Sequence, residues 1–277
     1  MKKLVMAVLA LAAISVSANH AQAKHQFAGS DTLAGAMTDA IIQSGLDQQI
    51  GYIGGGSGNG EKGLVTGDQG IAPMSREIKP EALTQLQSQG NDVNAHVIAL
   101  DGISLFVKKD HVLAGLDLPT IVRIFTCEYT KWEQIRGSNQ KGEILAVRRN
   151  DVSGTTDAFK HFTGLKNFGT CVKVVNETAD VAELTGRNPL AIGYSGLSGH
   201  TEHNRSVAIS REANSAAVLP TTKTIRNFSY PLSRKLYVYE IKGARKANAV
   251  EKQLLDSVLD RSFMDPIVQS HEFITID

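Results

Sequence analysis

Short apolar runs alternate with segments of helical spacing along most of the chain. Strand-like runs are predicted at 52–53, 70–72, 93–107, 143–147, 190–194, 207–209 and 236–241. Helices are predicted to follow a cap at Asp31 or Thr32, to open at Pro80, to cover 119–125, to follow a cap at Ser153, and to cover 250–259. This alternation predicts an α/β protein with mostly parallel sheets covered by helices on both faces.

The same pattern limits how such a chain could form two lobes. It contains no internal repeat and no low-complexity linker. Two lobes would therefore have to be joined by extended stretches, and the candidates are 97–108 and 230–241.

Composition narrows the class of protein. Of 277 residues, 42% are hydrophobic and 21% are charged, which excludes disordered and collagen-like chains. The formal net charge of +1 argues against nucleic acid or an anionic membrane as the main partner, because proteins that bind those carry a basic excess.

The first 23 residues have the features of a secretory signal. Lys2 and Lys3 precede an apolar run over 4–16, and small residues end at Ala23. The run is shorter than the ~20 residues that span a bilayer. We predict cleavage after Ala23, with a membrane anchor as the alternative.

Cys127 and Cys171 are the two cysteines of the chain, and both follow the signal. In an oxidising compartment such a pair is usually a disulfide, so we expect one here. Two buried free thiols are the alternative. A metal site would need more ligands than this pair supplies.

Each candidate motif for catalysis or cofactor binding lacks a required part. Residues 58–63 match G-x-G-x-x-G, but Gly67 and Asp68 interrupt the helix that a dinucleotide site needs. The segment 200–203 lacks the histidine spacing of a zinc motif, so we expect a solvated loop. No nucleophile–base pair is evident. We therefore expect no catalytic residues, no metal and no cofactor.

Hydroxyl residues and glycines recur instead where helices are expected to begin. The three segments are 29–33, 56–60 and 153–156. A helix start exposes unpaired N–H groups and the positive end of a dipole, and hydroxyls add donors. Arg76 and Arg149 stand nearby, and their planar guanidinium groups suit a tetrahedral oxyanion. Plain helix capping explains any one segment, but together they indicate an oxyanion site.

Ordered segments give the chain a specific resemblance. They are Gly-Ser-Asp-Thr-Leu at 29–33, Gly-Gly-Gly-Ser-Gly-Asn-Gly at 54–60, Ala-Pro-Met-Ser-Arg at 72–76, Ile-Phe-Thr at 124–126, Arg-Asn-Asp-Val-Ser-Gly-Thr-Thr at 149–156, Ala-Ile-Gly-Tyr-Ser-Gly at 191–196 and Tyr-Pro-Leu-Ser-Arg-Lys-Leu-Tyr-Val-Tyr at 230–239. Through these segments and their order, the chain resembles the periplasmic phosphate-binding proteins of high-affinity ABC phosphate transporters.

The resemblance implies a type II periplasmic-binding fold, with two α/β lobes joined by two crossover strands and a ligand cleft between them. Lobe I would comprise 24–107 plus 230–277, and lobe II 108–229. The implied phosphate ligands are Thr32, Leu33, Ser57, Ser75, Arg76, Arg149, Ser153, Gly154 and Thr155. The cysteines also fall where one branch of the family has a pair, which supports the disulfide.

Ser75 is a departure from the family pattern. Many members carry an aspartate there, which accepts the phosphate proton, whereas a serine hydroxyl carries no charge. If another carboxylate takes that role, Asp31 and Asp151 are the nearest in sequence to the predicted ligands. We expect Asp151 to pair with Arg149. For Asp31 both roles are left open: it could cap a helix, or it could accept the phosphate proton.

These observations predict a monomeric, non-enzymatic periplasmic protein that captures inorganic phosphate and delivers it to the permease subunits of an ABC transporter. The alternatives are the same fold tuned to sulfate, arsenate or a phosphonate, an exported phosphate-ester hydrolase, and an adhesion or signalling protein.

Overall fold

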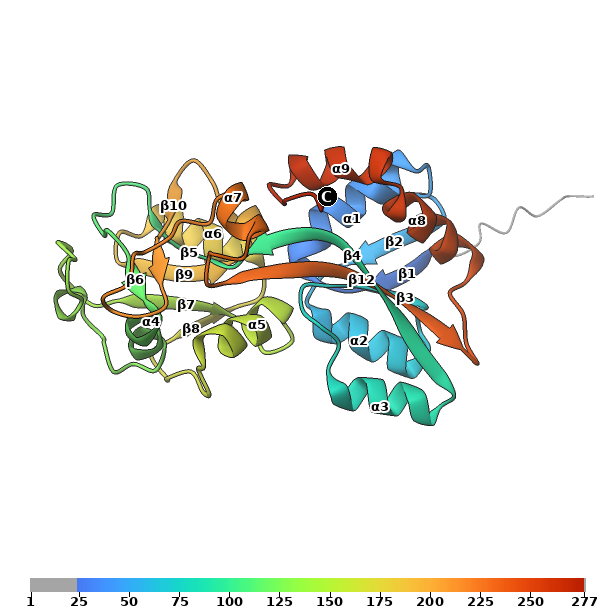
Figure 1. The fold of residues 1–277 in the computed structure, drawn as a ribbon, viewed down its shortest axis with the longest axis horizontal. Coiled ribbons are helices and arrows are strands. Elements are labelled where there is room, and N and C mark those ends of the chain that lie inside the picture. Colours follow the sequence, from blue (N-terminus) through green and yellow to red (C-terminus); the bar gives the residue numbers. More distant parts are fainter. Residues whose placement is uncertain (1–23, 277) are drawn as a thin grey trace, which may run out of the picture.

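The computed structural model describes residues 24–276, which form two α/β lobes side by side along the long axis (Figure 1). The predicted signal segment lies outside the described residues.

Lobe I is built on a three-stranded antiparallel sheet and a two-stranded parallel sheet. The strands are β1 (His25–Ala28), β2 (Ile50–Ile53), β3 (Ile71–Met74), β4 (Asn91–Gly102) and β12 (Ser233–Gly243), in the orders β1-β2 and β3-β12-β4. The helices are α1 (Ala34–Gln43), α2 (Ser57–Thr66), α3 (Pro80–Ser88), α8 (Ala249–Leu259) and α9 (Arg261–Ser270). A 3₁₀ turn over Asp31–Leu33 precedes α1.

Lobe II has a mixed five-stranded sheet in the order β10-β5-β9-β7-β8. Its strands are β5 (Ser104–Lys108), β7 (Leu145–Arg149), β8 (Lys173–Val175), β9 (Ala191–Ser195) and β10 (Asn204–Ser206), and a separate pair is formed by β6 (Leu116–Asp117) and β11 (Ile209–Ser210). Its helices are α4 (Leu118–Phe125), α5 (Gly154–Thr163), α6 (Thr178–Arg187) and α7 (Thr222–Arg226), and 3₁₀ turns cover Trp132–Gln134 and Leu197–Gly199.

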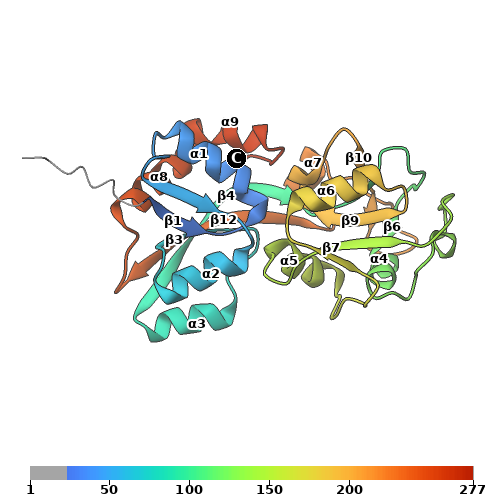
Figure 2. The ribbon, with the colours of Figure 1, turned by 180° about the vertical axis from the view of Figure 1, so that it is seen from behind.

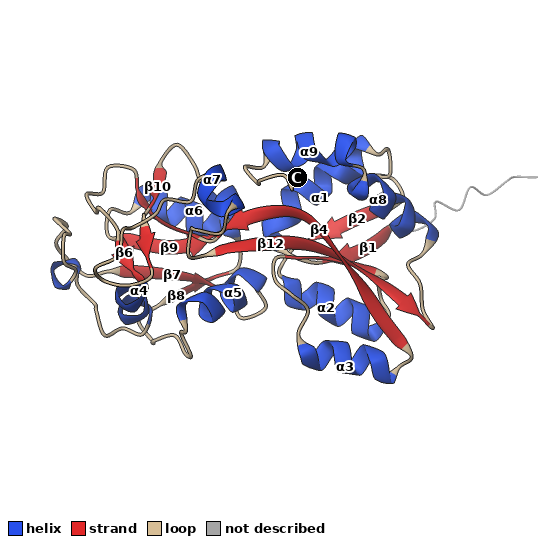
Figure 3. Cartoon of the chain, in the orientation of Figure 1, coloured by secondary structure: helices blue, strands red, loops and turns tan. Residues whose placement is uncertain are grey.

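Two long strands connect the lobes, as predicted. β4 leads into β5 past Ile103, and the chain returns through Leu232 into β12. The N–H of Ile103 donates to the Leu232 carbonyl at 2.9 Å, so the crossings lie side by side. Figure 3 shows both as strands reaching from one lobe toward the other, and Figure 2 shows the same pair from behind.

Each lobe has its own hydrophobic core. One cluster takes buried residues from 100–232 together with Ile274. A second cluster takes residues from 27–99 and 236–273, with a smaller third cluster beneath α2 and α3. Among the described residues, the two large clusters divide at the crossover strands, and polar groups make the contacts at the cleft itself.

The expected strand directions are only partly right. Among the described residues, four strand pairs are parallel and four are antiparallel, so the sheets are not mostly parallel. One cause is the connection between lobes, because β12 returns directly from lobe II and must run opposite to β4. Helices α6, α7 and α9 are additional to the predicted ones, and α2 begins at Ser57, within the segment 56–60 where a helix start was expected.

Within residues 24–276, no helix is long and apolar enough to cross a membrane.

Candidate oxyanion-binding site

Hydroxyl groups from the three predicted helix starts meet between the lobes. Thr32 Oγ1 lies 2.9 Å from Thr155 Oγ1, so lobe I and lobe II touch through these side chains. Ser57 Oγ lies 3.2 Å from Ser75 Oγ and accepts the Ser75 N–H at 3.0 Å. All four residues are at most 4% exposed. We call this group the hydroxyl cluster: Thr32, Ser57, Ser75 and Thr155.

The start of α5 is shaped for close approach. Ser153 caps the helix by accepting the Thr156 N–H, as its sequence position predicts. A Cβ on the next residue, Gly154, would collide with Ser57 Oγ and stand 2.8 Å from Ser75 Oγ. The absence of a side chain there lets the first N–H groups of α5, which have no partner within the helix, face lobe I.

The start of α2 faces lobe II in the same way. Gly56 has φ 134°, a conformation that favours glycine, and the Gly58 N–H donates to the Val152 carbonyl at 3.1 Å. This contact brings the first turn of α2 against the segment that precedes α5.

The third helix start differs from its prediction. The Leu33 N–H donates to the Ser30 carbonyl at 3.1 Å, and the Leu33 side chain is fully buried in the core of lobe I. Neither Asp31 nor Thr32 caps a helix: the cap residue of the 3₁₀ turn is Ser30 and that of α1 is Leu33. The 3₁₀ turn that precedes α1 takes up Asp31 and Thr32, which leaves both side chains free to reach lobe II.

Arg149, at the end of β7, is 1% exposed and lies shortly before the α5 start. Its Nη1 donates to Asp31 Oδ2 at 2.8 Å and to Thr178 Oγ1 at 2.9 Å, and Nε donates to the Asn176 carbonyl at 2.8 Å. Burial lowers the pKa of Arg149, and the Asp31 charge opposes that shift. Its Nη2 is buried and has no partner among the described residues, so one strong donor is left for an anion.

Arg234 is a site residue that the sequence analysis did not single out. It lies on β12 and is 4% exposed. Its Nη1 donates to Thr155 Oγ1 at 3.0 Å and to the Ser75 carbonyl at 3.2 Å, and its Nη2 lies 3.4 Å from Thr32 Oγ1. It therefore joins both sides of the hydroxyl cluster. Its presence in the segment 230–239 was a signal that could have identified it.

Asp101 holds Arg234 in place. Its Oδ2 accepts from Arg234 Nε at 2.9 Å and from Nη2 at 2.6 Å, while its Oδ1 accepts the Leu197 N–H at 3.0 Å. The carboxylate is fully buried and faces Arg234 across the β4–β12 ladder. The sequence analysis did not single out Asp101 either.

The two candidate acceptor carboxylates have different surroundings. Asp151 pairs with Arg148 at 2.6 Å, not with Arg149 as expected, and its side chain is 77% exposed. The hydrogen bond from Arg148 lowers the pKa of Asp151. The reason is that consecutive residues of β7 point to opposite faces, so Arg148 turns outward where Asp151 lies. Asp31 instead pairs with Arg149 between the lobes.

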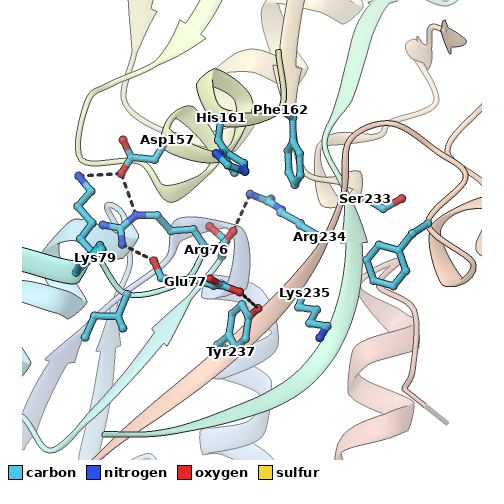
Figure 4. Close-up of a pocket in the computed structure, with 15 residues that line it drawn as sticks. Arg76, Glu77, Lys79, Asp157, His161, Phe162, Ser233, Arg234, Lys235 and Tyr237 are labelled. Carbon is cyan, nitrogen blue, oxygen red and sulfur yellow. Dashed lines mark hydrogen bonds and ion pairs between the residues drawn. The ribbon is translucent and has the colours of Figure 1, made fainter. Parts of the chain in front are cut away.

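Arg76 lies outside the hydroxyl cluster. Its Nη1 donates to Glu61 at 2.7 Å and its Nε to Asp157 of α5 at 2.9 Å, as Figure 4 shows for Asp157. Lys79 Nζ reaches the same Asp157 oxygen at 3.1 Å. The two ion pairs to Asp157 tie lobe I to lobe II at the edge of the cleft.

The disulfide and the loop over 200–203 are two further predictions that the structure tests. The disulfide between Cys127 and Cys171 is confirmed, with Cα atoms 6.0 Å apart. The segment 200–203 is a largely exposed loop, as predicted. Within the described part of the chain, no group of three or more histidine, cysteine, aspartate or glutamate residues could hold a metal.

Comparison with known proteins places this geometry in a family. Residues 16–260 match the family model of the PBP superfamily domain. The chain is 30% identical over 257 residues to the phosphate-binding protein PstS of Pseudomonas aeruginosa, covering 87% of this chain and 80% of that protein. It is 30% identical over 239 residues to PstS of Staphylococcus aureus, covering 84% and 72%.

Solved structures agree on the fold. A substrate-binding protein of Clostridium perfringens, assigned to a phosphate ABC transporter and solved with bound phosphate, superposes with a TM-score of 0.79 at 24% identity, covering 92% of this chain and 100% of that one. An ABC-type phosphate transport receptor from Vibrio cholerae gives 0.71 at 20% identity, covering 91% and 100%. The chain thus has the type II periplasmic-binding fold, and it belongs to the PBP superfamily and, within it, to the family of PstS phosphate-binding proteins.

Proposed function

We propose that this protein captures inorganic phosphate outside the cytoplasm and delivers it to an ABC transporter. It acts as a binding protein and not as an enzyme. The observation that carries the proposal is the hydroxyl cluster, which sits at three helix starts between two buried arginines. Helix-start amides and hydroxyls bind the oxygens of a tetrahedral anion, and the arginines offset its charge.

The proposed ligands follow from these contacts. Hydroxyls come from the cluster and from Ser153, an N–H group comes from Gly154, and the charge comes from Arg149 Nη2. The predicted ligand Leu33 is left out, because its N–H already donates to the Ser30 carbonyl. We add Arg234 to the ligands, because its Nη1 and Nη2 already contact the hydroxyls of Thr155 and Thr32 in the cluster. Charge-assisted hydrogen bonds contribute roughly 1.5–3 kcal/mol each. A handful of them accounts for the about 8 kcal/mol of a micromolar Kd, even after the costs of closing the lobes.

Arg76 is the predicted ligand whose role we revise. Its guanidinium is held by Glu61 and Asp157, at the edge of the cleft. We propose that Arg76 stabilises the closed arrangement of the lobes and that Arg234 takes its place among the phosphate ligands.

The remaining parts of the proposal concern the whole chain. We propose two lobes close to the predicted boundaries, 24–107 plus 230–277 and 108–229. The apolar clusters move the crossings slightly, because β5 (Ser104–Lys108) and the return stretch up to Leu232 pack with lobe II. We further propose cleavage after Ala23, a monomeric protein in the periplasm, and release of phosphate to inner-membrane permease subunits. The intact mass of exported protein tests the cleavage site: a chain beginning at Lys24 is expected, and an uncleaved mass would contradict it.

Calorimetric titration tests the ligand. Mature protein is stripped of bound anion and titrated with phosphate, arsenate, sulfate and a phosphonate. We expect phosphate to bind with at least micromolar affinity and sulfate to bind more weakly. Binding of sulfate with no binding of phosphate would overturn the proposed function while leaving the oxyanion site intact.

A further inference from the structure

A cavity of about 530 Å³ opens beside the hydroxyl cluster at the mouth of the cleft. Its walls come from the segment after β3 in lobe I, from α5 in lobe II and from β12 (Figure 4). The volume lies in the range of pockets that hold small organic molecules. A space of this size exceeds what a single inorganic anion in the cluster requires.

The cavity adjoins the proposed anion site. Ser75 and Arg234 line it, and both also belong to or contact the hydroxyl cluster. Ser75 is the position at which the resemblance leads us to expect an aspartate. A carboxylate there would face the anion with a charge, and only an anion oxygen that carries a proton could lie against it. A serine imposes no such condition, so an oxygen bonded to carbon can lie there instead.

The walls suit an organic group more than a second anion. Aromatic rings are contributed by Phe162 of α5, by Phe228 before β12 and by Tyr237 of β12. The Phe228 ring is exposed, with 44% of the residue accessible. The cationic groups that line the cavity are Arg76, Lys79, Arg234 and Lys235. They are matched in number by the lining carboxylates Glu77 and Asp157 and by Glu61 and Asp101, which pair with the two arginines, so little net positive charge is left for a second phosphate group.

One buried donor remains at this cavity. Arg76 is 9% exposed, and its Nη2 has no partner among the described residues although its other nitrogens do. A buried N–H donor without an acceptor is unfavourable, so such a group is a good partner for a polar atom of a ligand.

We infer that the site also binds monosubstituted phosphates, with the phosphoryl group in the hydroxyl cluster and the organic group in this cavity. The inference rests on the proposed function. The phosphoryl oxygens accept hydrogen bonds from the same donors as inorganic phosphate. The organic substituent extends past Ser75 and Arg234 into the cavity, where the aromatic rings cover it.

Phenyl phosphate is the probe that tests this inference. Stripped mature protein is titrated by calorimetry with inorganic phosphate, phenyl phosphate and pyrophosphate. We expect phenyl phosphate to bind within about tenfold of inorganic phosphate, in competition with it, and to bind more tightly than pyrophosphate. The variant Phe228→Ala should weaken phenyl phosphate by about three- to tenfold, the range of an aromatic contact, and should leave inorganic phosphate unchanged.

A matched control separates a local effect from a general one. Leu219 is another large exposed side chain, 49% accessible, and does not line the cavity. Leu219→Ala should change neither affinity. If inorganic phosphate binds and phenyl phosphate does not, or if pyrophosphate binds more tightly than phenyl phosphate, this inference fails and the proposed function stands. If none of the three anions binds, the proposed function itself fails.

Discussion

At the scale of single residues, the site is organised by two buried arginine–carboxylate pairs. Arg149 pairs with Asp31 and Arg234 pairs with Asp101, and both arginines are almost fully buried. Removing an ion from water is costly unless it is paired and hydrogen-bonded. Each carboxylate therefore lets a cation stay buried beside the hydroxyl cluster, where it can act on an anion in a medium that screens charge weakly.

The free Nη2 of Arg149 predicts a large effect on binding. Arg149→Ala should weaken phosphate binding by at least about 2–3 kcal/mol, the scale of a hydrogen bond to a charged group, or about 30- to 150-fold in Kd. Arg149→Lys should recover only part of the loss, because a single ammonium group cannot contact Asp31, the Asn176 carbonyl and an anion in the fixed geometry of a guanidinium. Calorimetry measures both, and equal affinity of Arg149→Ala and wild type would exclude this residue as a ligand.

The Asp101–Arg234 pair predicts a loss of stability that an anion can offset. Asp101→Asn leaves the Arg234 charge buried without its partner, which should cost about 3–5 kcal/mol of the free energy of unfolding. Phosphate supplies a compensating charge next to Arg234, so it should raise the stability of the variant more than that of wild type. Urea unfolding with and without phosphate measures this difference. If Asp101→Asn were as stable as wild type without phosphate, the argument would be contradicted.

His111 predicts a dependence of stability on pH away from the site. It is 5% exposed, it packs on Trp132 with ring centroids 4.3 Å apart, and neither ring nitrogen has a partner among the described residues. Burial, and then the Arg205 charge, lower its pKa. Because the fold favours the neutral ring, the unfolded chain binds a proton first as the pH falls below about 6.5, and stability should decrease there.

The control for this effect is His111→Leu. Thermal unfolding between pH 8 and 5 should show that the variant loses less stability on acidification than wild type does. Parallel curves for the two proteins would show that His111 does not contribute.

At the scale of elements, the site depends on the contact between the N-termini of α2 and α5. The Gly58 N–H bonds to the Val152 carbonyl just before α5, and Gly154 admits Ser57 and Ser75 against the first turn of that helix. The helix dipoles of α2 and α5 thus present their positive ends to one region. This is an arrangement that neither helix could make alone.

The close approach at Gly154 predicts a large effect on binding and a small one on stability. Gly154→Ala places a methyl group against Ser57 Oγ and Ser75 Oγ, so the lobes should not close fully and phosphate affinity should fall by about tenfold or more. The unliganded protein should lose little stability, because alanine is favoured over glycine in helices. Calorimetry and thermal unfolding measure the two effects.

Gly45→Ala provides the reverse pattern. Gly45 has φ 70° and no atoms within 4 Å of an added Cβ, so the substitution strains the backbone without blocking anything. It should lower the melting temperature and leave the affinity unchanged. If Gly154→Ala behaved like Gly45→Ala, the packing of α5 against lobe I would not be needed for binding.

At the scale of the whole molecule, the lobes are held together by polar contacts across the cleft. Asp157 of α5 accepts from Arg76 and Lys79 of lobe I, and the Asp31–Arg149 pair also crosses between lobes. The two large apolar clusters within 24–276 divide at the crossover strands. The pairs of Asp157 are partly exposed and therefore weak enough to break, which suits a protein that must open to exchange its ligand.

We call the ion pairs of Asp157 with Arg76 and Lys79 the latch between the lobes, and the variant Asp157→Asn tests how far the latch controls phosphate affinity. Asp157→Asn should favour open lobes, which would increase the radius of gyration of the unliganded protein in X-ray scattering. Phosphate affinity should fall by about two- to fivefold, the scale of a partly exposed ion pair, and should depend less on salt than in wild type. Glu183→Gln, which removes the exposed Glu183–Arg187 pair within α6, is the control. Equal effects of the two variants would argue against a latch.

The sequence by itself determined the local features of this protein. Helix starts at Pro80 and Ser153, the two extended crossings and the disulfide follow from proline, capping side chains, apolar runs and an isolated pair of cysteines, all of which act over a few residues or through composition. The resemblance added the order of the ligand segments. Most of the predicted ligands then meet in one region between the lobes.

Only the tertiary structure decided which distant groups meet. Arg149 contacts Asp31, 118 positions away, and Arg234 contacts Thr32, 202 positions away. No local rule distinguishes Asp31 from Asp151 as the partner of Arg149, because that choice depends on which face of β7 turns toward lobe I. The role of Asp101 likewise depends on its register with Arg234 across two strands that join the lobes. Pairings of this kind arise from the closure of the whole chain, so sequence position alone does not contain them.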